Sequence, residues 1–244
     1  MDAAERAFIV IPAYNAASTI GAVFRRIPEE VRHRIERYVV VNDGSRDETS
    51  AVVRRLQTEW PSLELLEHPV NRGYGEAVKT LLTHALSEGA GVAIVLHSDG
   101  QYSPEKIPDI LAVFDRGEAD IVQGSRMARG GNALGRMPLY KYIANKCLTA
   151  IENRAFGLGL AEYHSGYMAY NRKALETIPF QRLSGSFDFD LEMLVLARVK
   201  GLRVREVPIP TIYAGEKSYL NPIRYGFDVL RVVWDYKRGK YHRL

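Results

Sequence analysis

Short apolar runs alternate with longer amphipathic stretches through the first half of the chain. The runs predicted as strands are Phe8–Pro12, Tyr38–Asn42, Leu63–Leu66, Val92–Leu96 and Ile121–Gln123. The predicted helices between them are Ser18–Arg26, Asp47–Trp60, Tyr74–Ser87 and Ser103–Arg116, with Ser18 as the N-cap of the first. Continuous apolar runs separated by helices are typical of parallel strands that are buried on both faces. The pattern therefore predicts an α/β fold, with a mostly parallel sheet and helices on both of its faces.

The second half of the chain has a different rhythm. A Gly- and Arg-rich loop is expected over Met127–Gly135. After it the predicted elements are a helix Pro138–Phe156, a strand Gly166–Tyr170, a helix Asp190–Lys200, a strand Val204–Pro208 and a helix Pro222–Arg238. Since no linker separates two units, we expect one domain over residues 1–216 and a basic helical extension, 217–244, packed on it.

Two of these helices carry an apolar stripe with helical spacing. The first stripe consists of Leu139, Ile143, Cys147, Ile151 and Ala155, and the second of Ile223, Phe227, Leu230 and Trp234. We interpret the first as a core-facing stripe, with lipid contact as the alternative. The polar face opposite the second stripe alternates in charge, as a solvated face does, so we expect the second stripe to pack on the protein.

Composition excludes several classes of protein. The 244 residues are 46% hydrophobic and 25% charged, which is typical of a soluble globular protein. One cysteine, Cys147, rules out a disulfide framework and a multi-cysteine zinc site. The first six residues include acids and no apolar core of a signal peptide, and the apolar run 89–96 is too short to span a membrane. A cytoplasmic location is expected.

The positive charge is concentrated at the end of the chain. The net charge is +4, yet residues 217–244 hold seven Lys and Arg against two Asp. A nucleic-acid binder would be basic more uniformly, and no RNA-binding, zinc-finger or helix-turn-helix pattern occurs, so we expect no nucleic-acid partner. The segment Lys237–Arg243 is instead predicted to contact an anionic membrane surface or a lipid phosphate.

Polar, Gly-rich loops follow all five predicted strands of the first half. They are Pro12–Asn15, Asn42–Ser45, Asn71–Gly75, His97–Tyr102 and Gly124–Arg126. Each alone could be an ordinary turn, but parallel strands deliver all five to one edge of the sheet, where open α/β sheets bind ligands. The glycine fingerprint of dinucleotide-binding folds, the P-loop and the Gly-x-Ser-x-Gly elbow of hydrolases are absent.

These loops, with Ser165-Gly166 and Phe187–Glu192, resemble the motifs of family 2 glycosyltransferases, and most of all those of the dolichol- and polyprenol-phosphate mannose synthases. The resemblance runs in order from about Phe8 to Ser218. It implies a GT-A fold, a nucleotide-diphosphate sugar donor, a divalent cation and inversion at the anomeric carbon. Mannose from GDP-mannose is the donor expected from this branch, with UDP-glucose as the alternative.

The expected metal site follows the fourth strand. A hard cation such as Mg²⁺ or Mn²⁺ neutralises a leaving diphosphate, and the alternating residues Asp99 and Gln101 can offer oxygens to one side. The family's Asp-x-Asp-x-Gln motif has His97 in place of its first acid. A neutral imidazole ligates Mn²⁺ more readily than Mg²⁺. His97 is therefore either a third ligand or a structural histidine. This departure from the motif also motivates a further hypothesis, a nucleotide-sugar-binding module without turnover.

The resemblance also implies a donor site. Asp43 is expected to bind the nucleobase in a pocket with Pro12 and Tyr14, while Gly73 and Gly75 let the backbone approach the nucleotide. The other expected donor contacts are Asn15, Ser98, Asp99, Lys217 and Ser218, of which Lys217-Ser218 resembles a segment that closes over the diphosphate. The acid that relatives often carry after Asn15 is Ala16 here.

The acceptor decides which residues catalyse the transfer. A polyprenyl phosphate is already ionised and requires cations to position it, which the resemblance assigns to Arg126, with Arg136, Lys141 and Asn145 as further candidates. A hydroxyl acceptor would instead require a base, for which the candidates are Asp188, Asp190 and Glu192. The expected catalytic set is Asp99, Arg126 and Glu192. The expected setting is peripheral, at the cytoplasmic face of a membrane, with a homo-oligomer possible.

Overall fold

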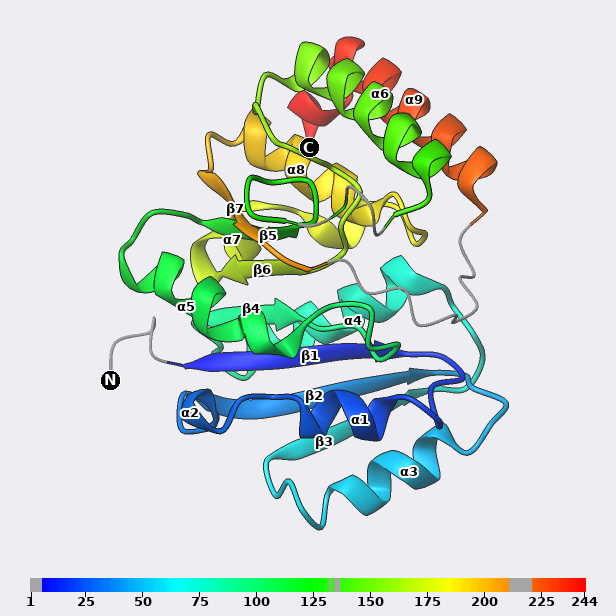
Figure 1. Cartoon of the computed structure of the whole chain (residues 1–244), viewed down its shortest axis with the longest axis vertical. Helices are drawn as coiled ribbons and strands as arrows, with labels where there is room; N and C mark the ends of the chain where they lie inside the picture. The colour runs from blue at the N-terminus through cyan, green and yellow to red at the C-terminus, as the bar shows by residue number, and fades with distance from the viewer. Residues whose placement is uncertain (1–5, 132, 134–136, 211–220) are drawn as a thin grey trace.

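The computed structural model describes residues 6–131, 133, 137–210 and 221–244, and its central feature is one seven-stranded sheet (Figure 1). The strands stand in the order β3-β2-β1-β4-β6-β5-β7. Their bounds are Ala7–Ala13 (β1), Ile35–Asp43 (β2), Leu63–His68 (β3), Val92–Val95 (β4), Ile121–Ser125 (β5), Met168–Asn171 (β6) and Val204–Pro208 (β7). Only β6 among them runs antiparallel to its neighbours. The predicted mostly parallel sheet is confirmed.

Nine α-helices occur within the described residues. They are Ile20–Arg25 (α1), Glu29–Arg32 (α2), Thr49–Leu56 (α3), Tyr74–Ser87 (α4), Ile107–Asp115 (α5), Leu139–Phe156 (α6), Arg172–Thr177 (α7), Phe189–Val199 (α8) and Pro222–Lys237 (α9). Short 3₁₀ helices occupy Pro104–Lys106, Phe180–Arg182 and Tyr241–Arg243. The prediction of Ser18 as the first N-cap was wrong, because α1 follows Thr19. The sequence also missed α2 and α7, which are too short to show a period.

The core has two halves, one on each face of the sheet. Along β1, Phe8 and Val10 face a cluster that includes residues of α4 and α8, whereas Ile9 and Ile11 face a cluster that includes residues of α1 and α5. This alternation within one fully apolar strand is what a sheet covered by helices on both faces requires. The predicted two-sided arrangement is confirmed.

The order of the strands creates a switch point between β1 and β4. The chain moves outward from β1 through β2 to β3 and then returns to pair β4 with the other side of β1. The loops after these two strands diverge at that point, which is where open α/β sheets bind ligands. Because β6 runs in the opposite direction, the segment that leads into it, with Ser165 and Gly166, reaches the same edge as the carboxyl ends of the parallel strands.

Helices α6 and α9 lie side by side at one end of the molecule, and α9 also packs on α8 (Figure 1). The prediction that the apolar stripe of α9 packs on the protein was wrong. Val229, Val232 and Val233 are buried instead, and the stripe is exposed at Ile223, Phe227, Leu230 and Trp234. The interpretation of the α6 stripe as core-facing was also wrong. The buried residues of α6 are Asn145, Thr149, Glu152 and Phe156, and none of them belongs to the stripe. The division into 1–216 and 217–244 stays a prediction.

Candidate active site

Hydrogen bonds tie together the loops at the switch point. The buried Ser98 donates its hydroxyl to the carbonyl of Pro12 (2.9 Å), which joins the end of β4 to the end of β1. Asn15 has a left-handed backbone (φ 51°), and its side chain accepts from the backbone N–H of Arg46 (2.9 Å). These bonds bring four predicted donor contacts to one edge of the sheet, namely Pro12, Asn15, Ser98 and Asp99. Tyr14 lies between the first two in sequence.

Asp43 holds a loop in place. One of its carboxylate oxygens accepts from His68 Nδ1 (2.7 Å) and from the backbone N–H of Arg72 (2.9 Å). The other accepts from the backbone N–H of Gly73 (2.9 Å). Asp43 itself is buried. The carboxylate thus fixes the 71–73 loop against the end of β2, and its expected contact with the nucleobase stays a prediction.

The two glycines of this loop contact another part of the protein. Gly73 has φ +97°, and a Cβ atom at Gly75 would lie 2.6 Å from the carbonyl oxygen of Ser184. The N–H of Gly75 donates to the carbonyl of Gly185 (3.0 Å). We expected these glycines to let the backbone approach the nucleotide, whereas in the structure they let it approach the 184–185 turn.

His97 follows β4 and contacts Gly166, just before β6, and Tyr74 of α4. Its Nε2 lies 3.2 Å from the carbonyl oxygen of Gly166 and 3.2 Å from the hydroxyl of Tyr74. A carbonyl can only accept, so Nε2 carries the proton and Nδ1 keeps the lone pair. Burial lowers the pKa of His97, which favours the neutral imidazole. The ring is therefore suited to donate electrons through Nδ1, as a ligand would.

Asp190 is the most perturbed acid of the site. It lies in the first turn of α8, where its Oδ2 accepts from the Tyr74 hydroxyl (2.7 Å). Its Oδ1 is buried and has no hydrogen-bond partner among the residues that the structure describes. Burial raises the pKa of Asp190 to about 7. A carboxylate with one oxygen that accepts no hydrogen bond and with such a pKa has the properties of a general base.

The other two acids of this helix end are engaged. Asp188 accepts from the hydroxyl of Ser184 (2.5 Å) and from Arg231 of α9 (2.8 Å). Glu192 accepts from the backbone N–H of Ser184 (2.5 Å) and from the Tyr241 hydroxyl (2.7 Å). Both carboxylates thus hold the 184–186 turn and the C-terminal segment. The expected catalytic role of Glu192 stays a prediction.

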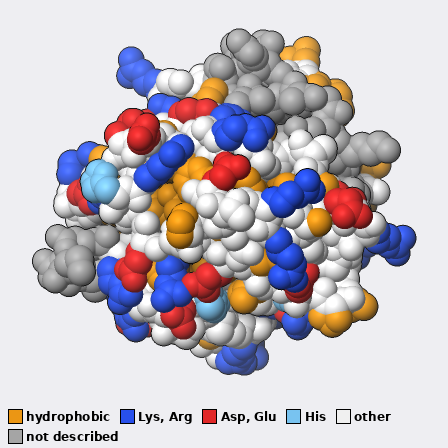
Figure 2. Space-filling view, turned by 90° about the horizontal axis from the view of Figure 1, so that it is seen from below, with side chains coloured by type: hydrophobic (Ala, Val, Ile, Leu, Met, Phe, Trp, Pro, Cys, Tyr) orange, Lys and Arg blue, Asp and Glu red, His pale blue; other side chains and the backbone are white. Residues whose placement is uncertain are grey.

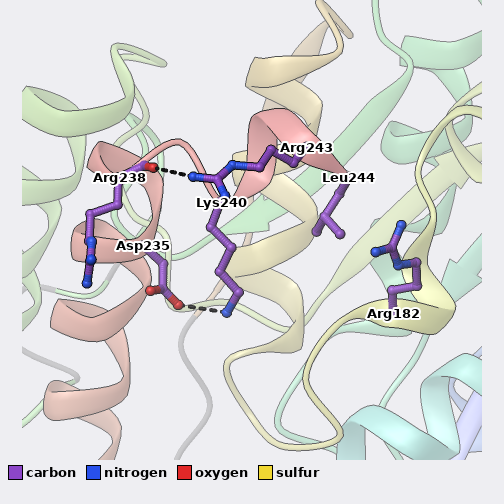
Figure 3. A pocket seen from close by; sticks show the side chains of 6 residues that line it. All are labelled: Arg182, Asp235, Arg238, Lys240, Arg243 and Leu244. Atoms are coloured by element: carbon purple, nitrogen blue, oxygen red, sulfur yellow. Dashed lines mark hydrogen bonds and ion pairs between the residues drawn. The ribbon is translucent and has the colours of Figure 1, made fainter.

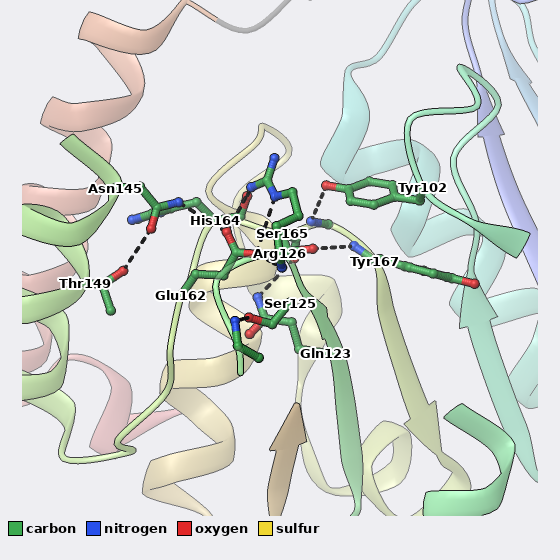
Figure 4. A network of polar contacts seen from close by, with 12 residues as sticks. Tyr102, Gln123, Ser125, Arg126, Asn145, Thr149, Glu162, His164, Ser165 and Tyr167 are labelled. Carbon is green, nitrogen blue, oxygen red and sulfur yellow. Dashed lines mark hydrogen bonds and ion pairs between the residues drawn. The ribbon is translucent and has the colours of Figure 1, made fainter. Parts of the chain in front are cut away.

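Arg126, directly after β5, belongs to a polar network around Glu162 (Figure 4). Its Nη2 donates to a Glu162 oxygen (3.0 Å) and to the carbonyl of His164 (2.8 Å). Asn145 of α6 donates to the same carboxylate (3.1 Å). Glu162 is fully buried, whereas 17% of the Arg126 side chain is exposed. Two predicted acceptor residues, Arg126 and Asn145, therefore meet on Glu162, a residue that the sequence analysis missed.

Three of the expected residues, Arg136, Lys217 and Ser218, lie outside the described residues. Lys141 is half-buried in the first turn of α6. A separate cavity of about 450 Å³ lies beside the C-terminal segment, with Arg182, Arg238 and Arg243 in its wall (Figure 3). Its carboxylate, Asp235, is paired with Lys240 (2.7 Å). We place no part of the reaction in that cavity, because its walls come from none of the strand-end loops.

The residues around Asp99 can be tested for a fit to a divalent cation. Among the described residues, no group of three or more His, Cys, Asp and Glu side chains could hold a metal ion. Asp99 offers a carboxylate, of which Oδ1 accepts from the backbone N–H of Gln101 (3.0 Å). Mg²⁺ in nucleotide sites is often bound by one or two carboxylates, with the remaining ligands supplied by phosphate and water. The donor set thus fits a cation that binds together with a diphosphate.

Comparisons with known proteins identify relatives of this chain. The protein is 28% identical to a UDP-N-acetylglucosamine--dolichyl-phosphate N-acetylglucosaminyltransferase of Methanococcus voltae, over 84% of this chain and 85% of that protein. It is 29% identical to the polyprenol monophosphomannose synthase of Mycolicibacterium smegmatis, over 84% and 77%. An uncharacterized protein of Methanocaldococcus jannaschii is 32% identical, over 84% and 81%.

Solved structures share the fold. The glucosyl-3-phosphoglycerate synthase of Mycobacterium tuberculosis, crystallised with Mn²⁺, UDP and glucosyl-3-phosphoglycerate, superposes with a TM-score of 0.68 at 18% identity. The superposition covers 95% of this chain and 79% of that one, which establishes the GT-A fold. The model of the family described as Glycosyl transferase family 2 matches residues 8–179. This chain is a glycosyltransferase that belongs to that family.

Proposed function

We propose that this protein transfers a sugar from a nucleotide diphosphate to a polyprenyl phosphate, with inversion at the anomeric carbon. The observation that carries the proposal is the guanidinium of Arg126, fixed at the same sheet edge as Asp99. The names of two relatives, from Methanococcus voltae and Mycolicibacterium smegmatis, state a dolichyl phosphate and a polyprenol monophosphate. These names differ in the sugar, so GDP-mannose is proposed as the first donor to test, against UDP-sugars.

The donor half of the reaction is assigned to the switch point. Tyr14, Asn15 and Ser98 border the place where the nucleotide would lie, and Asp99 would hold Mg²⁺ or Mn²⁺ with the diphosphate. The cation would supply the positive charge that stabilises the leaving diphosphate. His97, neutral and with Nδ1 unprotonated, is proposed as a further protein ligand beside Asp99 and Gln101. Asp43 contributes by holding the 71–73 loop beside this space.

The acceptor half is assigned to Arg126. A phosphate acceptor already carries the nucleophilic oxygen in ionised form, so the protein has to bind and orient it. Glu162 and the carbonyl of His164 fix the guanidinium in one orientation before substrate arrives, which removes a reorganisation cost during reaction. Lys141 and Arg136 are proposed as further cations for the same phosphate.

A second candidate function rests on Asp190. A base for a hydroxyl acceptor requires a pKa near neutrality and an oxygen that can take the proton. Asp190 has a pKa of about 7, its Oδ1 accepts no hydrogen bond among the described residues, and its Oδ2 is held by Tyr74. In that case the sugar would pass to a hydroxyl group, and Asp190 would take the proton. A phosphate acceptor would need no such proton transfer, so the two functions differ in the residue on which turnover depends.

Comparing Arg126→Ala with Asp190→Asn on one polyprenyl phosphate separates the two functions. We expect Arg126→Ala to lower kcat/KM by roughly 10- to 150-fold, equivalent to about 1.5–3 kcal/mol, with donor binding unchanged in calorimetry. Arg126→Lys should recover part of this, since a point charge does not reproduce a planar fork. Asp190→Asn should retain most of the transfer. The opposite pattern would favour the hydroxyl acceptor.

Folding needs its own control in this comparison. Arg126→Ala leaves the fully buried Glu162 without its ion-pair partner, which is strongly destabilising in other proteins. The double variant Arg126→Ala/Glu162→Gln removes both charges and keeps the amide of Asn145 next to a polar partner. If that variant melts like the wild type and still fails to transfer the sugar, the loss belongs to Arg126 and not to unfolding.

A further inference from the structure

Exposed apolar side chains are concentrated on two helices. Among the described residues, ten large hydrophobic side chains are exposed, and eight of them lie on α6 and α9. These are Leu139, Tyr140, Ile143, Ile151, Ile223, Phe227, Leu230 and Trp234. Their exposed fractions run from 43% to 74%. Scattered apolar residues are normal on a surface, but a cluster of this kind on two neighbouring helices marks an interaction site.

The stripes point away from the protein on both helices. In α6, residues at four-residue intervals from Leu139 through Ile143 and Cys147 are exposed, whereas Asn145 and Thr149 on the other side are buried. In α9, the exposed stripe that includes Phe227 likewise lies apart from the buried valines. Helices α6 and α9 pack side by side (Figure 1). We name the exposed apolar side chains of the two helices together the α6–α9 face.

The charge of these segments is strongly positive. Residues 139–156 and 222–244 hold nine Lys and Arg against three Asp and Glu. Glu152 is fully buried, and Asp228 and Asp235 are each paired, with Arg231 (3.2 Å) and Lys240 (2.7 Å). The acidic groups are therefore already neutralised or withdrawn. The solvent-exposed surface of the two helices therefore consists of apolar side chains next to cations such as Lys146 and Lys237.

We propose that the α6–α9 face docks in the headgroup region of a bilayer that contains anionic lipids. Both helices would lie in the plane of the membrane, with their apolar stripes among the acyl chains and their cations at the lipid phosphates. No described helix is long and apolar enough to cross a membrane. The exposed Tyr140 and Trp234 belong to the residue types that are enriched at membrane interfaces.

Charge complementarity favours a bilayer over a second copy of the chain. Two such faces brought together would bring two pairs of segments, each with an excess of six cations over acids (9 − 3), close to each other, whereas an anionic lipid surface neutralises this charge. The opposite end of the molecule has no comparable bias: Figure 2 views the end that carries α3 and β3 and shows charges of both signs interspersed. Ion pairs such as Arg54 with Glu67 (2.6 Å) occur there.

The inner sides of the two helices contact the candidate acceptor site. Asn145 of α6 donates to Glu162, which holds Arg126 (Figure 4). The Tyr225 hydroxyl of α9 lies 3.2 Å from His164 Nδ1, and the carbonyl of His164 accepts from Arg126. Docking of the α6–α9 face would thus place Arg126 one helix away from the lipid phosphates. This link to the acceptor rests on the proposed function, whereas the docking itself does not.

The chain carries a natural reporter on each helix. Cys147 is its single cysteine, is exposed and lies on the α6 stripe, so an environment-sensitive fluorophore can be attached to the wild-type protein. Trp234 on α9 is one of two tryptophans. The other, Trp60, packs against Phe24 and Tyr38, and Trp60→Phe removes its signal. We expect both reporters to shift to the blue with phosphatidylglycerol vesicles and to be quenched by brominated lipids.

Variants then test which surface is responsible. Full burial of one such side chain contributes roughly tenfold or more to a partition constant, so Ile223→Ser/Phe227→Ser should weaken vesicle binding about a hundredfold. The matched control is Val70→Ser, which changes an equally exposed aliphatic residue away from the face (65% exposed) and should leave binding unchanged. Equal losses in both variants, or no binding by the wild type, would overturn the docking proposal.

Two further measurements complete the test. A blue shift that grows with protein concentration in the absence of vesicles would show that a second copy covers the face, and would also overturn the proposal. Transfer to a short, water-soluble prenyl phosphate without vesicles tests the proposed function alone. Vesicle binding without this transfer contradicts the proposed function and supports the docking proposal. Transfer without vesicle binding supports the proposed function and contradicts the docking proposal.

Discussion

Asp190 is expected to lower the stability of the folded protein when it ionises. Its pKa is raised by burial from 3.8 to about 7. Between these values the unfolded chain releases the proton while the folded protein keeps it, so the free energy of unfolding falls as the pH rises through this window. Roughly three pKa units at about 1.4 kcal/mol each give a loss of about 4 kcal/mol. Above pH 7 the contribution is constant.

Asp190→Asn isolates the contribution of Asp190 to the pH dependence of the free energy of unfolding. The amide oxygen can still accept from Tyr74, so the variant changes the charge and little of the geometry. In urea unfolding, the variant should gain stability over the wild type by about 1.4 kcal/mol per pH unit from about pH 5 to about pH 7, and the gain should then level off. Tyr74→Phe removes the hydrogen bond that lowers this pKa, so the levelling should occur at higher pH. A stability difference that is independent of pH would refute the reasoning.

Three further predictions concern the sheet edge. Asp99→Ala should lower kcat by roughly a hundredfold or more in steady-state assays, and a loss of about tenfold or less would contradict its place at the diphosphate. His97→Asp should shift the ratio of activities with Mn²⁺ and Mg²⁺ toward Mg²⁺; an unchanged ratio means that His97 is no ligand. Gly75→Ala should cost about 1–3 kcal/mol in thermal unfolding, because the new Cβ would meet the carbonyl oxygen of Ser184. Gly21→Ala, with nothing closer than 3.5 Å, should stabilise by about 0.5–1 kcal/mol and serves as the control.

The sheet was predictable because its strands are continuous apolar runs that the helical segments separate. The direction of β6 was not, because a four-residue strand has the same hydrophobic pattern in either direction. That direction matters for the site, since it brings the carbonyl of Gly166 to His97 and so fixes the tautomer of the imidazole. The sequence singled out His97 but carried no information on which of its nitrogens bears the proton.

The residues around the candidate acceptor site show a second limit of the sequence analysis. Periodicity found the apolar stripes of α6 and α9, but a stripe does not reveal what it packs against. The sequence analysis expected the rest of the chain to cover both stripes, whereas most of their side chains are exposed among the described residues. Glu162 lies in a loop without a motif, so its pairing with Arg126 became visible only through the fold. The sequence analysis named Asp188, Asp190 and Glu192 as candidate bases and put Glu192 in the expected catalytic set, whereas burial and hydrogen bonding distinguish Asp190.

The antiparallel pairing of β5 with β6 has a consequence for how such proteins diversify. The whole excursion from Arg126 to Ser165, including α6, leaves the sheet on one strand and returns on the adjacent one, with Gln123 opposite Met168. Its two ends are therefore held close together by the scaffold, and a segment of another length can be closed there at little entropic cost. This segment can be replaced by another one while the pairing of β1 with β4 keeps the switch point unchanged. On the proposed function, exchanging this segment would change the acceptor preference and leave the proposed nucleotide half in place.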